Sequence, residues 1–566
     1  MAEDVSARLS LRALVVGIVI GTLAASSNLF VTLKVGWSLP VMVPAAIGAY
    51  SVFSLLLRTG LSSPSIRPTE LAIVSTIASS AGYMSGGGNM AALPALWLST
   101  HQLPSAAALV VWCTAVASLG IVLAGHFRSA ILANPKLRFP TGIAAGEVMQ
   151  VLTSGKDARR QVRLLVAAFV LGLLVSAVHD RALGAFALPH FIALGGAIRG
   201  VSCGVLTLGV ETSLLLASAG AIMSLRVGWS SLLGAVTSYV VLVPILLERS
   251  VLTEASYAAI VRFMVWPSAS ILLFSAFTSF ALEGRRLVEA LKLIAPQPES
   301  RGRGGMAIVL ATIVSLLFVY LFHVPWWLPL LVLPMSVVVA IVAIRSMGET
   351  DVVPTKALAP LAQLGTATFA PGDLVANLIA PNVACGVALH AADAMTSFRV
   401  GERFGASPRT QQAAGIIGAC VGGLVTVPLF LLLVHDEKAM PSPLFPVPGV
   451  LAWKSISEAL GSGLSCLPRA VHVAIAIAAL LGVILSLAER FVPPKFAAFV
   501  PSPTAIGSSL VLPASSSLSI FWGASIATLV HRRTGASAIL ICACGLIAGE
   551  SIGGIVPIVI RTIAGW

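Results

Sequence analysis

The chain has 566 residues, of which 57% are hydrophobic and only 10% are charged, and its mean hydropathy is +0.97. A soluble globular protein carries about 25% charged residues, so this composition excludes that class and predicts an all-α polytopic integral membrane protein. The net charge of +13 does not indicate nucleic-acid binding, because the basic residues cluster in short loops between apolar segments, as the positive-inside rule describes.

The apolar segments are continuous rather than alternating, which favours helices over strands. They predict about 12–16 transmembrane or re-entrant helices, several of them broken by Gly or Pro. Arg8 and Arg12 precede the first segment, so we expect the N-terminus on the cytoplasmic side. That segment is long enough to span and is followed by no A-x-A-like site, so we do not interpret it as a cleaved signal peptide.

The segment that begins at Pro68 contains three successive glycines. Each Gly in a helix costs about 1 kcal/mol relative to Ala, so the helix is expected to break here. Unwound backbone at membrane depth survives only where it lines a cavity or is buried in protein. The residues around this break are therefore candidate substrate contacts: Tyr83, Gly86, Gly87, Gly88 and Asn89. Met84 is more typical of core packing than of a metal ligand.

The next unusual element is the short segment 139–149, which has basic residues on both sides. Both of its ends are therefore expected in the cytoplasm, and the segment is interpreted as re-entrant, with Glu147 as a candidate proton site. Glu211 is predicted to lie in an apolar span farther along and is another candidate for proton coupling. The basic linker that begins at Arg285 follows.

Past this linker, several motifs return in the same order. WSLP at 37–40 recurs as WWLP at 326–329, NMAALP at 89–94 as NLIAP at 377–381, and AAGEVM at 144–149 as AADAM at 391–395. The last spacing is about forty residues shorter, as if the second half lacked one span. We predict two parallel repeats, 1–284 and 306–566, joined by the linker 285–305. Such repeats place a substrate site near the midplane, at the repeat interface.

The stretch from Gly372 to Gln412 holds most of the polar candidates of the second half. Asp373 and Asn377 precede an apolar run and are further candidate substrate contacts, and Asn377 is the repeat partner of Asn89. His390 and Asp393 are three positions apart, so they share one helix face. Ionisable groups at membrane depth usually mark a site. We interpret this pair as a proton relay, or as an imidazole oriented by a carboxylate; a polar helix–helix contact is the alternative.

The remaining ionisable residues in apolar segments receive weaker interpretations. Glu550 is a further candidate for proton coupling. Lys34, Arg226 and Arg561 are expected to extend toward a membrane interface. The His residues form no ligand cluster, and the seven Cys residues contain no CxxC motif, so we expect no resident metal, cofactor or disulfide framework. The polar stretch that begins at His435 is expected outside the cell.

Seven sequence motifs, taken together, resemble those of a known protein family. NLFVTLKVGWSLP, SAGYMSGGGNMAALPAL, FPTGIAAGEVM, GETDVVPTKALAPLAQL, GDLVANLIAPNVACGVALHAAD, GASPRTQQAAGIIGA and FPVPGVLAWKSISEAL run along essentially the whole chain. In this order they resemble the oligopeptide transporter (OPT) family, which includes the yellow stripe-like metal-chelate transporters. The NPGPFN-type and KIPPR-type signatures are absent, so the chain is more similar to the bacterial and yellow stripe-like branch.

The resemblance implies secondary-active, proton-coupled uptake of small oligopeptides or peptide-like metal chelates across the inner (plasma) membrane. Two other classes stay open. An intramembrane enzyme would need a catalytic motif, but GxGD fails at Gly372–Asp373 and HExxH is absent. A passive channel is the other alternative. No Walker motif is present, which argues against ATP-driven transport by this chain. Expected partners are substrate, protons and lipid, but no nucleic acid; a homodimer is left open.

Overall fold

The computed structural model describes residues 9–36, 38–58, 67–86, 88–134, 137–153, 158–179, 187–282, 303–350, 353, 355–433, 440–442, 445–462, 467–493 and 495–564. Three sequence expectations fall outside these ranges: the conformation of Gly87, the placement of the basic linker before Arg303, and the side of the membrane on which residues 435–438 lie. The direction of the Arg561 side chain is a fourth expectation that lies outside what the structure describes.

The first half of the chain is helical up to residue 178. Its elements are α1 (Leu11–Val35), α2 (Met42–Arg58), α3 (Pro68–Gly82), η1 (Tyr83–Ser85), α4 (Asn89–Thr100), α5 (Ala106–Leu132), α6 (Pro140–Thr153) and α7 (Ala158–Val178). After a short stranded region it continues with α8 (Leu215–Ile222), α9 (Leu225–Ala235), the π-helix η3 (Val236–Leu242), α10 (Val243–Glu248) and α11 (Tyr257–Leu282).

The second half is helical throughout its described residues. Its elements are α13 (Arg303–Phe322), α14 (Leu328–Thr350), α15 (Thr355–Phe369), α16 (Leu374–Arg403), α17 (Pro408–Leu433), α18 (Pro448–Ser462), α19 (Arg469–Phe491), η7 (Ala497–Phe499), α20 (Pro503–Ser509), α21 (Ala514–Thr534) and α22 (Ala536–Ala564).

Eleven helical stretches in the described residues are long and apolar enough to cross a membrane. This confirms the all-α polytopic class. Most of the other helices are too short to cross a hydrocarbon core about 30 Å thick. Among these are α4 with 12 residues and α6 with 14. The short length of α6 agrees with its interpretation as a segment that does not span.

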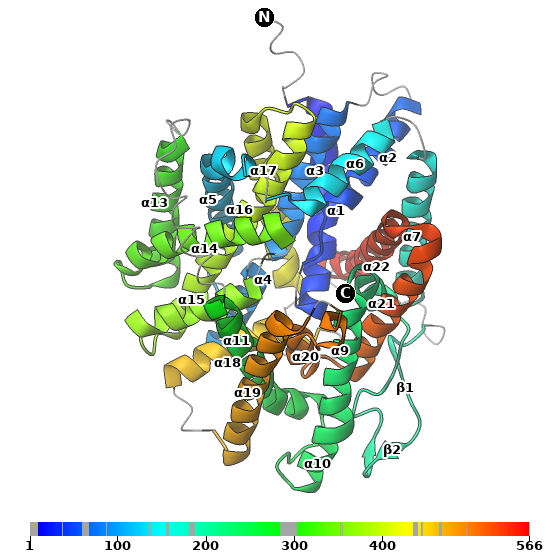
Figure 1. Cartoon of the computed structure of the whole chain (residues 1–566), viewed down its shortest axis with the longest axis vertical. Coiled ribbons are helices and arrows are strands. Elements are labelled where there is room, and N and C mark those ends of the chain that lie inside the picture. Colours follow the sequence, from blue (N-terminus) through cyan, green and yellow to red (C-terminus); the bar gives the residue numbers. More distant parts are fainter. Residues whose placement is uncertain are drawn as a thin grey trace, which may run out of the picture.

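The stranded region lies between α7 and α8, at the edge of the molecule (Figure 1). Strand β1 (Phe191–Ala193) pairs antiparallel with β4 (Gly209–Glu211), and β2 (Ala197–Ile198) pairs with β3 (Val201–Ser202). Gly196 and Gly200 have φ angles of 103° and 80°, and these positions favour glycine and turns over a continuous helix.

The prediction that Glu211 lies in an apolar span is therefore wrong. Its backbone pairs with Phe191 in the β1–β4 ladder. Its Oε1 accepts hydrogen bonds from Ser515, at 3.2 Å, and from Ser516, both at the start of α21. Glu211 fixes the strands to that helix, so we do not retain it as a coupling acid.

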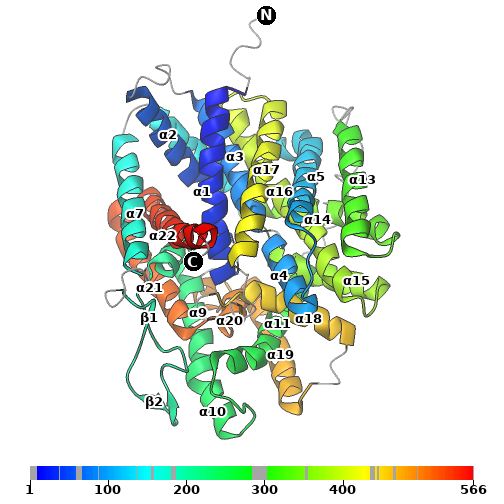
Figure 2. The same ribbon diagram turned by 180° about the vertical axis from the view of Figure 1, so that it is seen from behind.

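Helix α16 lies at the centre of the molecule (Figures 1 and 2) and is buried along almost its whole length. It packs against α3, α4, α5, α14 and α15. The α5 contact is close because Gly120 has no Cβ, which would overlap the carbonyl of Val387. Small residues at such crossings let membrane helices approach, since lipid provides no hydrophobic force between them.

The element order explains the shortened spacing between the sequence motifs. In the first half, the helices that carry NMAALP and AAGEVM, α4 and α6, are separated by the complete helix α5. In the second half, NLIAP and AADAM lie in the single helix α16. Helices α3 and α15, which precede the two breaks, are both 15 residues long. The two-repeat organisation stays a prediction, and these matches support it.

The first turns of α1 and α7 and the turn between α16 and α17 lie at the same end of the molecule (Figures 1 and 2). We expect this end to be cytoplasmic, because it carries basic residues near helix termini. A cysteine in place of the exposed Arg409 should resist a membrane-impermeant thiol reagent applied to intact cells. A cysteine at Trp326, which is 75% exposed and follows α13, should react. The reverse labelling pattern would invert this topology.

Candidate functional site

The break after α3 is held open by glycine. Helix α3 ends at Gly82 and continues as the single turn η1, after which Gly86 is extended and Gly88 has a φ of 87°. A Cβ at Gly86 would lie 2.6 Å from Leu389 Cδ2, and one at Gly88 would lie 2.5 Å from the indole of Trp453. The expected interruption of the helix is confirmed, and α16 and α18 pack directly against it.

Asn89 binds within the protein rather than facing an open space. Its Nδ2 donates to Met84 O at 2.9 Å, and its Oδ1 accepts from Asn382 Nδ2 at 2.8 Å. Asn382 Oδ1 in turn accepts from Trp112 Nε1 at 3.0 Å. That Asn89 and Asn377 both contact substrate stays a prediction; the side chain that binds Asn89 directly is that of Asn382. This chain of amides ties the break to α16 and α5.

Replacing Trp112 by Phe tests this hydrogen-bonded chain. The change removes the indole N–H and leaves the carbonyl oxygen of the buried Asn382 amide without a donor, which costs about 1–3 kcal/mol. We expect a clear fall in the melting temperature of the purified protein. The same change at Trp522, which is 55% exposed, should leave the melting temperature nearly unchanged. Equal shifts in the two variants would contradict a structural role for the amide chain.

Asn377 differs from Asn89 in its hydrogen bonding. It is fully buried, and among the described residues neither atom of its side-chain amide has a hydrogen-bond partner. Close by, Gln363 Nε2 of α15 donates to Trp453 O at 3.0 Å and to Ser457 Oγ at 2.9 Å. Ser457 Oγ donates to Asn377 O at 3.3 Å, while Gln363 Oε1 has no partner.

Leaving a buried polar atom without a partner costs about 1–3 kcal/mol, and native folds contain few of them. The unpaired atoms of Asn377 and Gln363 therefore make this junction of α15, α16 and α18 the candidate site of this structure. The sequence interpretation missed Ser457 because residues 435–460 are interpreted there only as an external polar stretch, and it missed Gln363 because LAPLAQL serves there only as part of a family motif. The usable signal for Gln363 is that it is the single polar residue of LAPLAQL; Ser457 lies among several polar residues and has no such signal.

Asp393 and His390 are both buried in α16, with 5% and 1% exposure. Asp393 Oδ1 accepts from Ser79 Oγ of α3 at 2.6 Å, and among the described residues it forms no ion pair. Neither ring nitrogen of His390 has a hydrogen-bond partner in the part of the chain that the structure describes. The interpretation of His390 as an imidazole oriented by Asp393 is therefore wrong. Asp393 remains as a buried carboxylate that contacts a different helix through a single hydroxyl.

Other candidate acids have local structural roles. Asp373 is the N-cap of α16, where its Oδ1 accepts from Ala376 N at 2.9 Å. Glu147 lies on the exposed side of α6, so it does not match the burial of its repeat partner Asp393. Glu550 is buried and accepts from Leu214 N at 2.9 Å and from the Ser213 hydroxyl, at the N-terminus of α8. Carboxylates are favoured at that end of a helix.

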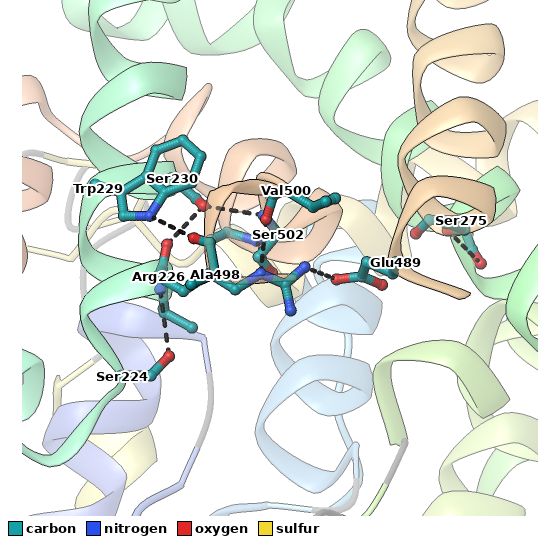
Figure 3. Close-up of polar contacts among 12 residues, drawn as sticks. Ser224, Arg226, Trp229, Ser230, Ser275, Glu489, Ala498, Val500 and Ser502 are labelled. Atoms are coloured by element: carbon teal, nitrogen blue, oxygen red, sulfur yellow. Dashed lines mark hydrogen bonds and ion pairs between the residues drawn. The ribbon is translucent and has the colours of Figure 1, made fainter. Parts of the chain in front are cut away.

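Arg226 was expected to extend toward an interface, and this expectation is wrong. Its Nε donates to Val500 O at 2.7 Å, and its other end forms an ion pair with Glu489 of α19. Ser230, one turn farther along α9, accepts from Ser502 N at 2.9 Å. Figure 3 shows these contacts converging from three segments. A guanidinium has donors on several sides, so Arg226 holds α9, α19 and the segment before α20 together.

The basic residues near the end of α16 are bound away from Asp393. Arg399 donates to Glu402 at 3.1 Å and to Leu137 O at 2.9 Å, and Arg403 donates to Gln150 Oε1 at 2.7 Å. In this conformation they connect α16 with the α5–α6 connection and with α6. Among the described residues, no three His, Cys, Asp or Glu side chains lie close enough to hold a metal ion.

The protein has many membrane-spanning helices, and some helices are interrupted at buried positions beside unpaired polar groups. These features are typical of polytopic membrane transporters. The family model described as OPT oligopeptide transporter protein matches residues 8–293 and 304–561. The chain therefore belongs to the OPT family, and this family consists of transporters, not enzymes.

Three relatives illustrate the similarity. "Probable metal-nicotianamine transporter YSL16" of Oryza sativa is 23% identical and covers 97% of this chain and 90% of its own length. "Iron-phytosiderophore transporter yellow stripe 1" of Zea mays is 22% identical over 96% of this chain and 89% of its own length. "Putative oligopeptide transporter YGL114W" of Saccharomyces cerevisiae is 26% identical, but the match covers only 43% of this chain and 35% of the yeast protein.

Proposed function

We propose that this protein is a secondary-active, proton-coupled transporter of a small peptide or peptide-like metal chelate, acting in the inner (plasma) membrane. The observation that carries the proposal is a set of buried polar atoms without partners among the described residues: both amide atoms of Asn377, and Oε1 of Gln363. Gln363 binds the backbone of Trp453, whose indole lies against Gly88 at the break. A transporter must bind its substrate within the membrane and release it, so it needs polar groups that a ligand can satisfy. The relatives that match almost the whole chain are named for metal chelates of this kind.

Proton coupling rests on Asp393. A carboxylate that is buried among apolar helices pays a desolvation cost, which favours its neutral form. Because Ser79 is its one hydrogen-bond partner among the described residues, a movement of α3 relative to α16 would change the environment of the carboxylate. Asp393 then takes up a proton when it is open to the outside and releases one when it is open to the cytoplasm. Glu550, buried on α22, is the second candidate acid.

Transport by purified protein in proteoliposomes tests this function. Labelled tri- to pentapeptides and an iron–nicotianamine chelate are supplied with and without an inward proton gradient. We expect accumulation of at least one of these compounds above its external concentration, and only when the gradient is present. Equilibration that ignores the gradient would instead identify a passive channel.

A further inference from the structure

We propose that Asn377, Gln363 and Ser457 form a substrate subsite that binds the amide or ammonium groups of the ligand's organic backbone, and not its metal. The inference rests on the proposed transport of a peptide or peptide-like chelate and adds what the site recognises. It also gives two residues, Gln363 and Ser457, a place in substrate recognition.

The orientation of Gln363 follows from its partners. The backbone oxygen of Trp453 can only accept, so the group of the Gln363 amide that lies 3.0 Å from it must be the nitrogen. The second proton of this nitrogen goes to Ser457 Oγ. Gln363 Oε1 is therefore held in a fixed direction as a buried acceptor without a donor. A ligand that fills this position must bring an N–H or O–H group.

Asn377 sets a second requirement for the hydrogen-bonding groups of the ligand. Both of its amide atoms are unpaired, so it offers one acceptor and one donor group whichever way the amide is turned. The hydroxyl of Ser457 has no free proton, because it donates to Asn377 O and accepts from Gln363. Ser457 acts as a positioning residue, because it links the Gln363 side chain to the backbone of Asn377 and so fixes the two amides relative to each other. A peptide bond, or an amine next to a carbonyl, supplies the matching donor and acceptor.

The charges around the subsite further restrict the kinds of ligand group that it can bind. Its three side chains are uncharged, and none is a usual ligand for a transition metal. On α18 the neighbouring charges, Lys454 and Glu458, form an ion pair with each other. Asp373 is occupied in capping α16. Recognition by this subsite is therefore through hydrogen bonds to uncharged side chains and does not involve the metal, so the metal-free form of a chelator should compete with the metal-bound form.

The test uses full-length protein in proteoliposomes, with labelled tetra-alanine and the iron–nicotianamine chelate as probes. Asn377→Leu should raise the KM of the transported probe at least about tenfold, equal to about 1.4 kcal/mol, with a nearly unchanged maximal rate. The melting temperature of the empty protein should stay the same or rise, because the change removes an unsatisfied buried group. Gln363→Leu should also raise KM. Metal-free nicotianamine should inhibit uptake of the chelate.

Thr366→Val is the matched control. Thr366 is buried on α15 one turn after Gln363, but its hydroxyl bonds to Ala362 O of its own helix, so KM should not change. KM values within about twofold of the wild type in both subsite variants would overturn the subsite alone. A failure of metal-free nicotianamine to inhibit, while the chelate is transported, would overturn the subsite as well. A wild-type protein that accumulates neither probe would instead overturn the proposed function on which the subsite rests.

Discussion

An Asp393→Asn variant is expected to lose accumulation driven by a proton gradient completely. The amide keeps the shape of the side chain and can still accept a hydrogen bond from Ser79, but it cannot exchange a proton. Exchange of labelled for unlabelled substrate at equal pH should partly survive, because substrate binding does not require the carboxylate to titrate. The measurement compares accumulation and exchange in the same proteoliposome preparation.

Glu147→Gln is the control for this experiment. It removes an acid of the same charge from an exposed position on α6, so both accumulation and exchange should stay at the wild-type level. An Asp393→Asn protein that still concentrates substrate against its gradient would place the coupling acid elsewhere. Glu550→Gln would then be the next variant to examine, because Glu550 is also buried in the described structure.

The sequence predicted the features of this protein that depend on composition and on backbone preference. Continuous apolar segments indicate helical spans regardless of their neighbours, and three glycines break a helix in almost any environment. The buried positions of Asn377 and Asp393 could also be anticipated, because both lie in the long apolar stretch that becomes α16. These inferences use only local information.

The partners of these residues could not be predicted, because they come from distant parts of the chain. Asn89 contacts Asn382 and not its motif partner Asn377, since the rotation of α16 decides which of its faces meets α4. Arg226 resembles a residue at a membrane interface until Glu489 is brought beside it. Glu211 was misplaced because the short strands around it have only 2 or 3 residues each. So few residues cannot show an alternating pattern.

Gly88→Ala is expected to abolish transport while the protein still inserts into the membrane. At a φ of 87°, a Cβ costs about 1–2 kcal/mol in backbone strain. It would also lie 2.5 Å from the indole of Trp453, and overpacking of this kind costs typically about 1–3 kcal/mol more. The indole has little room to move, because Trp453 is buried, with only 8% exposure. Uptake in proteoliposomes and the amount of inserted protein are the two measurements.

Gly372→Ala distinguishes the effect of backbone strain from the effect of steric overlap. Gly372 lies at the break before α16 with a φ of 80°, but a Cβ there would meet nothing within 4 Å. This variant therefore carries the backbone strain without the steric overlap, and it should retain most of its transport. Adding Trp453→Leu to Gly88→Ala removes the indole ring and should restore part of the activity, as expected for two residues in direct contact. Equal loss in the Gly88 and Gly372 variants would mean that backbone strain alone stops transport, and that the contact between the break and α18 has no role in it.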